Sequence, residues 1–267
     1  HHWTISGELA ADAKMHAAMS QTIIYQPLDE LSITLQHRHF SRKFTSQFGE
    51  TSQQASRVAN EQGVMLGGKY SGFRNLELRA YADLFIFPGN TFTASQTSKG
   101  LELMAEGNWH VSRPLSLMLR YKMKNRQQDV TGFRGILEYR QTHRIRCSAA
   151  WQQETYQLRA ALDATIATRQ TQANRLGWGA SLRAAVRPAA NFSVSASAAL
   201  FFTDDYSSAL YIYEPRLRNT FTNTALYYHG YRLAAVASWK IGKIFELSAK
   251  YGCLHFFNKK EKQKNSF

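Results

Sequence analysis

Apolar and polar residues alternate with a period of two along most of this chain, in stretches of about 10–13 residues. In the stretch 156–166, Leu158 and Leu162 belong to the apolar row, and Arg159 and Asp163 belong to the polar row. Strands of soluble proteins are usually about 5–6 residues long, whereas a tilted strand needs about 9–11 residues to cross a bilayer. The length of the alternating stretches therefore favours strands that span a membrane.

This pattern predicts an all-β fold, an antiparallel up-and-down transmembrane β-barrel of the outer membrane. Thirteen strands are predicted, at about residues 3–11, 15–26, 31–43, 63–72, 75–88, 99–111, 115–126, 140–153, 156–170, 175–187, 192–204, 230–241 and 244–257. Because nothing downstream returns to pair with the last strand, we expect an incomplete barrel. Residues 1–257 would form one barrel domain, and residues 258–267 a charged C-terminal tail. A soluble all-β protein is the alternative fold.

The predicted connections alternate in length along the chain, as do the short periplasmic turns and long extracellular loops of outer-membrane barrels. The short connections lie at 26–30, 72, 111–115, 154, 187–191 and 241–243, and the long ones at 45–62, 88–98, 125–139, 171–174 and 203–230. This alternation predicts that the sequence GILEYRQTHRIRCSAAW belongs to the return into a single strand. The sequence ELAADAKMHAAMSQ is rich in helix-forming residues, and a short helix competes with a strand there.

Large aromatic residues lie close to the short turns. The predicted aromatic girdle consists of Trp109, Trp151, Trp239 and Phe245. Rings of this kind sit at the interface between lipid and water. We therefore expect membrane lipid, and lipopolysaccharide as a further candidate, to contact the apolar rows.

The chain is strongly basic, with 33 Lys and Arg residues against 19 Asp and Glu residues and a net charge of +14. Such a balance suits an anionic partner. Six arginines on the polar rows form a predicted cationic wall of the lumen: Arg144, Arg146, Arg159, Arg175, Arg183 and Arg187. This wall would attract anions. Alternatively, its charges pair with Asp163, Glu102 and Glu106 and fill the barrel.

The longest predicted extracellular loop, Thr203–Gly230, is rich in aromatic and acidic residues. Its candidate site residues are Asp204, Asp205, Tyr206, Tyr211, Tyr213 and Glu214. Loops on rigid scaffolds often carry function, so this loop is a candidate lid, plug or docking surface for protein partners. The alternative is an ordered loop that packs over the barrel mouth.

The sequence contains little that indicates a metal site or a catalytic site. His37 and His39 share one strand face, but no third metal ligand is evident. No spacing identifies a nucleophile and its base. We expect no metal, no cofactor and no enzymatic activity.

From residue 60 onward, several motifs carry a resemblance to a known family: NEQGVMLGG, AYADLFIFPG, SKGLELMAEGNW, TDDYSSALYIYEP and YYHGYRLAAVASWKIGKIFELSAKYG. The chain resembles the C-terminal barrel of helix-hairpin-helix domain-containing, competence-related outer-membrane proteins of Gram-negative bacteria. In that family a DNA-binding module precedes the barrel. This chain departs from the family pattern because it has no paired-helix segment such as LPGIG, and because it ends in NKKEKQKNSF instead of a final strand.

The sequence therefore predicts an outer-membrane pore or transport component with a cationic lumen wall, in a Gram-negative bacterium. A non-conducting barrel that docks surface or periplasmic partners through its long loops is the alternative. A role in DNA uptake, with nucleic acid as the partner, is implied by the resemblance alone.

Overall fold

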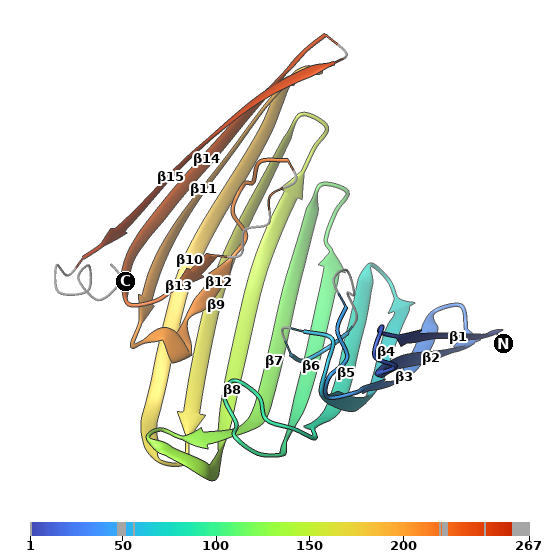
Figure 1. Cartoon of the computed structure of the whole chain (residues 1–267). Coiled ribbons are helices and arrows are strands. Elements are labelled where there is room, and N and C mark those ends of the chain that lie inside the picture. The colour runs from blue at the N-terminus through green and yellow to red at the C-terminus, as the bar shows by residue number, and fades with distance from the viewer. Residues whose placement is uncertain are drawn as a thin grey trace. The chain divides into compact units, whose positions relative to one another are not determined.

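A computed structural model describes residues 2–46, 52–55, 57–218, 220, 224–242 and 244–257. The chain forms a 13-stranded antiparallel sheet with the strand order β1-β2-β3-β4-β5-β6-β7-β8-β9-β10-β11-β14-β15 (Figure 1). These strands are β1 (His2–Ala11), β2 (Ala17–Leu28), β3 (Leu31–Phe40), β4 (Glu61–Phe73), β5 (Leu76–Phe87), β6 (Ser98–His110), β7 (Leu115–Val130), β8 (Phe133–Gln152), β9 (Tyr156–Arg169), β10 (Gln172–Ala189), β11 (Phe192–Thr203), β14 (His229–Ile241) and β15 (Phe245–Phe256). The predicted number of strands is confirmed.

The connection between β11 and β14 contains three further elements, which the sequence did not predict. They are the 3-10 turn η1 (Tyr206–Ser208) and the two short strands β12 (Leu210–Ile212) and β13 (Thr224–Leu226), which pair with each other. Among the described residues, no helix is long and apolar enough to cross a membrane.

The predicted long loops 125–139 and 171–174 need correction, and the second is a tight turn, because β9 ends at Arg169 and β10 starts at Gln172. The predicted loop 125–139 is instead the tip of a tall hairpin, in which β7 continues to Val130 and β8 starts at Phe133. Gly132, with a φ of 85°, supplies the left-handed conformation that such a tight turn requires. No helix forms at ELAADAKMHAAMSQ, because the Asp12 carboxylate accepts hydrogen bonds from the backbone N–H groups of Lys14 and His16 and closes a turn there. The prediction of one strand through GILEYRQTHRIRCSAAW is confirmed by β8.

The contacts divide the chain into two compact units. Unit 1 comprises residues 1–107, 121–143 and 168–173, and unit 2 comprises residues 108–120, 144–167 and 174–267. The predicted tail 258–267 lies outside the described residues. In both units the connections of each strand define two ends: a short-turn end, which holds links such as β2–β3 and β10–β11, and a long-loop end, which holds links such as β3–β4 and β11–β14.

Burial on the two faces of the sheet is the reverse of that in a soluble protein, because large apolar side chains are exposed and charged side chains are buried. One face, the apolar face, exposes large apolar side chains, in unit 1 Leu35, Val64, Leu66, Leu84 and Ile86, and in unit 2 Leu158, Leu162, Ile166, Leu176, Leu182 and Leu200. The opposite, polar face of unit 1 buries charged side chains, namely Arg38, Glu61, Asp83, Glu102, Glu106 and Glu138. Soluble proteins almost never bury such charges while they expose so many large apolar residues. An apolar face that meets lipid explains the arrangement.

Unit 1 is held together on its polar face by a buried ion cluster. The Arg38 guanidinium donates from Nε to Glu61 over 2.6 Å and forms two bonds of 2.9 and 3.0 Å to Asp83. The Gln54 side chain donates to Asp83, and its backbone N–H donates to Glu61. Gly63 makes room for this cluster, because a Cβ atom at that position would lie 2.5 Å from the Arg38 guanidinium carbon. The cluster thereby ties the β3–β4 connection to three strands.

The residues of the predicted girdle lie on the apolar face of unit 2, at the short-turn end. Trp109, Trp151, Trp239 and Phe245 are all exposed there. A second set of rings, which the sequence analysis missed, lies on the same face at the long-loop end. It includes the stacked pairs Trp178–Phe202 and Tyr231–His255, with ring centroids 4.7 and 5.1 Å apart.

The spacing of the two aromatic sets fits a bilayer. Phe192, which is paired in register with Trp239 of the girdle, and Phe202 of the second set lie ten residues apart in β11. This separation corresponds to about 33 Å along a strand that rises about 3.3 Å per residue. With the tilt of about 35–45° that barrel strands adopt, the height is about 25 Å, which is the height of the apolar band of such barrels.

This assignment of the apolar face predicts a depth-dependent cost for a buried charge. Leu162 lies in the middle of β9 and Leu158 close to its short-turn end. We expect Leu162→Arg to lower the free energy of unfolding in lipid vesicles by about 2–4 kcal/mol, and Leu158→Arg by about 0–1 kcal/mol. Guanidinium titration of the folded barrel in vesicles measures both values. Equal small losses would show that this row does not face lipid.

Candidate functional site

The six arginines of the predicted wall lie on the polar face of unit 2. Arg144 and Arg146 come from β8, Arg159 comes from β9, and Arg175, Arg183 and Arg187 come from β10. Period-two alternation places them there, because their neighbours Leu158, Leu176 and Leu182 occupy the exposed apolar face. Strand geometry thus brings residues that are up to 43 positions apart in the sequence onto one surface.

Three of these arginines have partners. Arg146 donates from Nε to Asp163 over 2.6 Å and from a terminal nitrogen to the Tyr211 carbonyl over 2.7 Å. Arg175 lies 3.3 Å from Asp205, and the Arg144 guanidinium lies 4.9 Å from the centre of the Tyr211 ring. The alternative prediction, in which the arginines of the wall pair with carboxylates such as Asp163, is therefore correct for Arg146. Glu102 is not a partner of the wall, since its ion pair is with Lys122 in unit 1.

The other three arginines of the wall carry uncompensated charge. Within the described part of the chain, the side chains of Arg159, Arg183 and Arg187 form no ion pair with a carboxylate, and all three are exposed. Their charges are therefore available to a mobile anion on this face.

The described residues of the connection between β11 and β14 (204–218, 220 and 224–228) lie against the same polar face, and we name them the crossing segment (Figure 1, orange). Its hairpin packs Leu210, Ile212 and Leu226 against Ala199 and Phe201 of β11. Glycines on β10 permit the close approach, because a Cβ atom on Gly179 would lie 2.7 Å from the Leu210 side chain. A Cβ atom on Gly177 would lie 2.3 Å from the Ser208 carbonyl oxygen. The segment is therefore fitted to the sheet.

Charged contacts fix the crossing segment from one end of the strands to the other. At the long-loop end, Asp204 accepts a 2.7 Å hydrogen bond from the backbone N–H of Leu176. Farther along, Glu214 is bound by Arg232 of β14 over 2.7 Å and by Lys250 of β15 over 3.5 Å. At the short-turn end, Arg218 lies 3.2 Å from Glu246, the second residue of β15.

The predicted site residues of this loop thus divide by role. Asp204, Asp205, Tyr211 and Glu214 fix the segment to the polar face, whereas Tyr206 and Tyr213 are exposed, at 62% and 67%. The contacts place the segment along the polar face, and its role as a lid, plug or docking surface stays a prediction. Sequence reasoning did not find this course, although the glycines on the polar row of β10 were a usable signal.

The buried Glu214 carboxylate of the crossing segment is bound by two cations, Arg232 and Lys250. Its burial raises the pKa, but the hydrogen bond and positive charge of Arg232 outweigh that effect, so the pKa lies below its ordinary value of 4.5. A carboxylate whose pKa is lowered by folding stabilises the folded state fully above its ordinary pKa, and this contribution is lost as the pH falls through the lowered value. The anchor is therefore intact at neutral pH and releases only in acid.

The lowered pKa of Glu214 leads to a prediction about the effect of pH. We expect hydrogen exchange of residues 209–218, corrected for the intrinsic rate, to be slow at pH 7 and to accelerate below pH 4.5. Glu214→Gln should exchange fast already at neutral pH and lose most of the acid step. An equally large step in this variant would assign the acid sensitivity to another carboxylate, such as Asp205.

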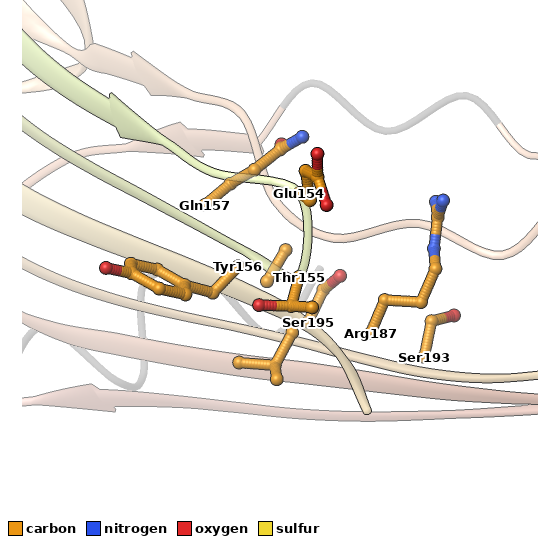
Figure 2. A pocket seen from close by; sticks show the side chains of 9 residues that line it. Glu154, Thr155, Tyr156, Gln157, Arg187, Ser193 and Ser195 are labelled. Atoms are coloured by element: carbon orange, nitrogen blue, oxygen red, sulfur yellow. The ribbon is translucent and has the colours of Figure 1, made fainter. Parts of the chain in front are cut away.

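A depression of about 160 Å³ lies at the short-turn end of unit 2, where the turn from β8 to β9 meets β10 and β11. Figure 2 shows the side chains that line it, among them Glu154, Gln157, Arg187, Ser193 and Ser195. Arg187 and Glu154 extend to the same side of the strands in this view (Figure 2). Its lining thus combines Arg187 of the wall with the carboxylate of Glu154 and several hydroxyl groups.

The residues considered for metal binding lie elsewhere. His37 and His39 are on the apolar face of β3, in the same row as Leu35. No group of three potential metal ligands occurs in the described ranges.

Taken together, the antiparallel up-and-down sheet, the exposed apolar face and the charged opposite face define the outer-membrane β-barrel fold. Solved structures with a similar fold include two of OmpT, an outer membrane protein of Vibrio cholerae. The in-vitro folded form has 10% sequence identity and a TM-score of 0.52, and the match covers 94% of this chain and 76% of that one. The form expressed in the outer membrane has 10% identity and a TM-score of 0.53, with 89% and 65% of the two chains covered.

At this low identity the likeness establishes the fold alone. No family model matches the sequence, and no curated protein matches it. The resemblance to the helix-hairpin-helix proteins remains a prediction.

Proposed function

We propose that this chain is an outer-membrane pore of a Gram-negative bacterium, whose conduit is lined by the polar face and narrowed by the crossing segment. The observation that carries the proposal is the uncompensated charge of Arg159, Arg183 and Arg187 on that face. A structural wall would neutralise such charges, because unpaired like charges near one another destabilise the fold. Rings of Arg and Lys select anions in pores.

Conduction through planar bilayers tests this proposal. We expect the purified barrel to conduct, and a potassium chloride gradient to give a reversal potential of the sign for chloride preference. Replacing Arg159, Arg183 and Arg187 together by Gln should move the reversal potential towards zero. Arg79→Gln is the matched control, since Arg79 lies on β5 in unit 1 and is already paired with Glu77.

A folded barrel that is silent in bilayers would contradict the pore and favour the alternative, a barrel that docks partners. The exposed Tyr206 and Tyr213 support that alternative, because tyrosines are enriched in recognition surfaces. A partner that is retained by the whole chain, but lost after replacement of both tyrosines by Ser, would establish it. DNA uptake rests on the resemblance only, and the absence of enzymatic activity remains a prediction.

A further inference from the structure

One row of the polar face in unit 2 places two arginines side by side. The backbone N–H of Arg187 donates to the Thr155 carbonyl over 2.7 Å, which sets the register between β10 and β9. Four residues farther along both strands, Arg183 lies opposite Arg159. Residues directly opposite in an antiparallel pair have Cα atoms about 4.5–5.5 Å apart. Two guanidinium groups therefore project from neighbouring positions on the same face.

A third arginine is held over this row by the crossing segment. Arg216 follows Pro215, whose side chain is fully buried, and lies between the anchors Glu214–Arg232 and Arg218–Glu246. The positive charges of Arg216 and Arg159 both act on Arg183. Arg159 and Arg216 thus both lie within electrostatic reach of Arg183, although the three residues come from three separate parts of the chain.

Three carboxylates of unit 2 are each bound by an arginine outside this cluster. Asp163 binds Arg146, Glu214 binds Arg232, and Glu246 binds Arg218. Among the residues that the structure describes, Arg159, Arg183 and Arg216 have no carboxylate partner, and all three are exposed. Like charges directly opposite in a sheet are unfavourable, so the cluster is a site that an anion would stabilise.

A hydroxyl in the same row also lacks a partner. Ser197 of β11 is paired in register with Arg183 of β10. Its Oγ atom is buried and forms no hydrogen bond with the described residues. Buried polar atoms without a partner are rare and call for an explanation, and a bound oxyanion beside Arg183 would satisfy this donor.

We propose that Arg159, Arg183 and Arg216, together with the hydroxyl of Ser197, bind the phosphate group of a small solute. Arginine presents planar pairs of donors that match phosphate oxygens, and three cations suit a dianion better than a monocarboxylate. The inference rests on the proposed function and extends it, since it names the class of anion that would bind transiently at this point of the pore.

Calorimetry in detergent micelles tests the site without any need for conduction. The probes are glucose 6-phosphate and inorganic phosphate, with glucuronate as the matched carboxylate. We expect both phosphates to bind and glucuronate to bind at least tenfold more weakly. Arg183→Gln, Arg159→Gln and Arg216→Gln should each weaken glucose 6-phosphate binding about tenfold or more, which is the range for a lost charge-assisted bond. Arg79→Gln should leave it unchanged.

Several results would overturn the inference: equal binding of glucuronate, no binding of either phosphate, or binding of a single-stranded oligonucleotide but not of glucose 6-phosphate. If inorganic phosphate binds and glucose 6-phosphate does not, the natural ligand of the site is free phosphate. If glucose 6-phosphate binds more strongly than inorganic phosphate, the natural ligand is a phosphorylated solute. The Arg216→Gln variant keeps the test valid if changes in the strands impair folding, because Arg216 lies in the crossing segment. Phosphate binding by a barrel that does not conduct would leave this inference intact and reject the pore.

Discussion

Replacement of Tyr206–Leu226 by a short Gly-Ser linker is expected to raise the single-channel conductance severalfold and to leave the sheet folded. The described residues of this stretch lie over the polar face of unit 2, from Ser208, which approaches Gly177 at the long-loop end, to Arg218, which contacts Glu246 at the short-turn end. A few residues suffice to close the gap, because β11 and β14 are paired up to Phe202 and His229. The Thr203 N–H also donates to the Tyr228 carbonyl over 2.8 Å.

Planar-bilayer recording measures the conductance, and heat-modifiable migration on a gel verifies the fold. Glu214→Gln is the matched control, because it weakens one anchor but keeps the segment. It should give a mean conductance near that of the parent chain, with more frequent current fluctuations. An unchanged conductance after the deletion would mean that the crossing segment does not narrow the path.

The second large effect is expected at the buried ion cluster of unit 1. Arg38→Met leaves the carboxylates of Glu61 and Asp83 buried without their guanidinium. Removing one partner of a buried ion pair costs about 3–5 kcal/mol, because the remaining charge stays desolvated. We expect a loss of that size in the free energy of unfolding, measured by guanidinium titration in lipid vesicles.

Two further variants separate desolvation from packing. Arg79→Met breaks a half-exposed ion pair with Glu77, for which a loss of at most about 1 kcal/mol is expected. Adding Glu61→Gln and Asp83→Asn to Arg38→Met should restore much of the loss, since the uncompensated charges are then gone. If this triple variant were as unstable as Arg38→Met alone, packing rather than charge would explain the effect.

The strands and their faces could be predicted from the sequence because the alternation of side chains is a local property. Leu158, Leu162 and Ile166 mark the apolar face of β9 without any knowledge of neighbouring strands. The predicted loop 125–139 was wrong for a related reason: the continuation of β7 and β8 into a tall hairpin is polar, and polar sequence there does not distinguish a loop from a strand beyond the membrane.

The division of the wall into paired and unpaired arginines could not be predicted. Arg146 and Arg183 occupy equivalent positions in the alternation, yet only Arg146 meets a carboxylate, Asp163. The difference depends on the register between strands and on the course of the crossing segment, and neither is encoded within a single strand. Gly177 and Gly179 were the local sign of that course, since glycine on the polar row leaves space for another backbone.

The sequential strand order also has a consequence for how the chain assembles. From β1 to β11 each strand pairs with its successor, and most of these pairings close only a short stretch of chain, with a small entropic cost. The pairings of β3 with β4 and of β11 with β14 close longer connections, and the second of these closes the crossing segment. Arg232 and Lys250, which hold Glu214, belong to strands that follow this closure. We therefore expect the sheet to grow hairpin by hairpin, with a slower late phase in which the segment docks, and the linker variant to lack that phase.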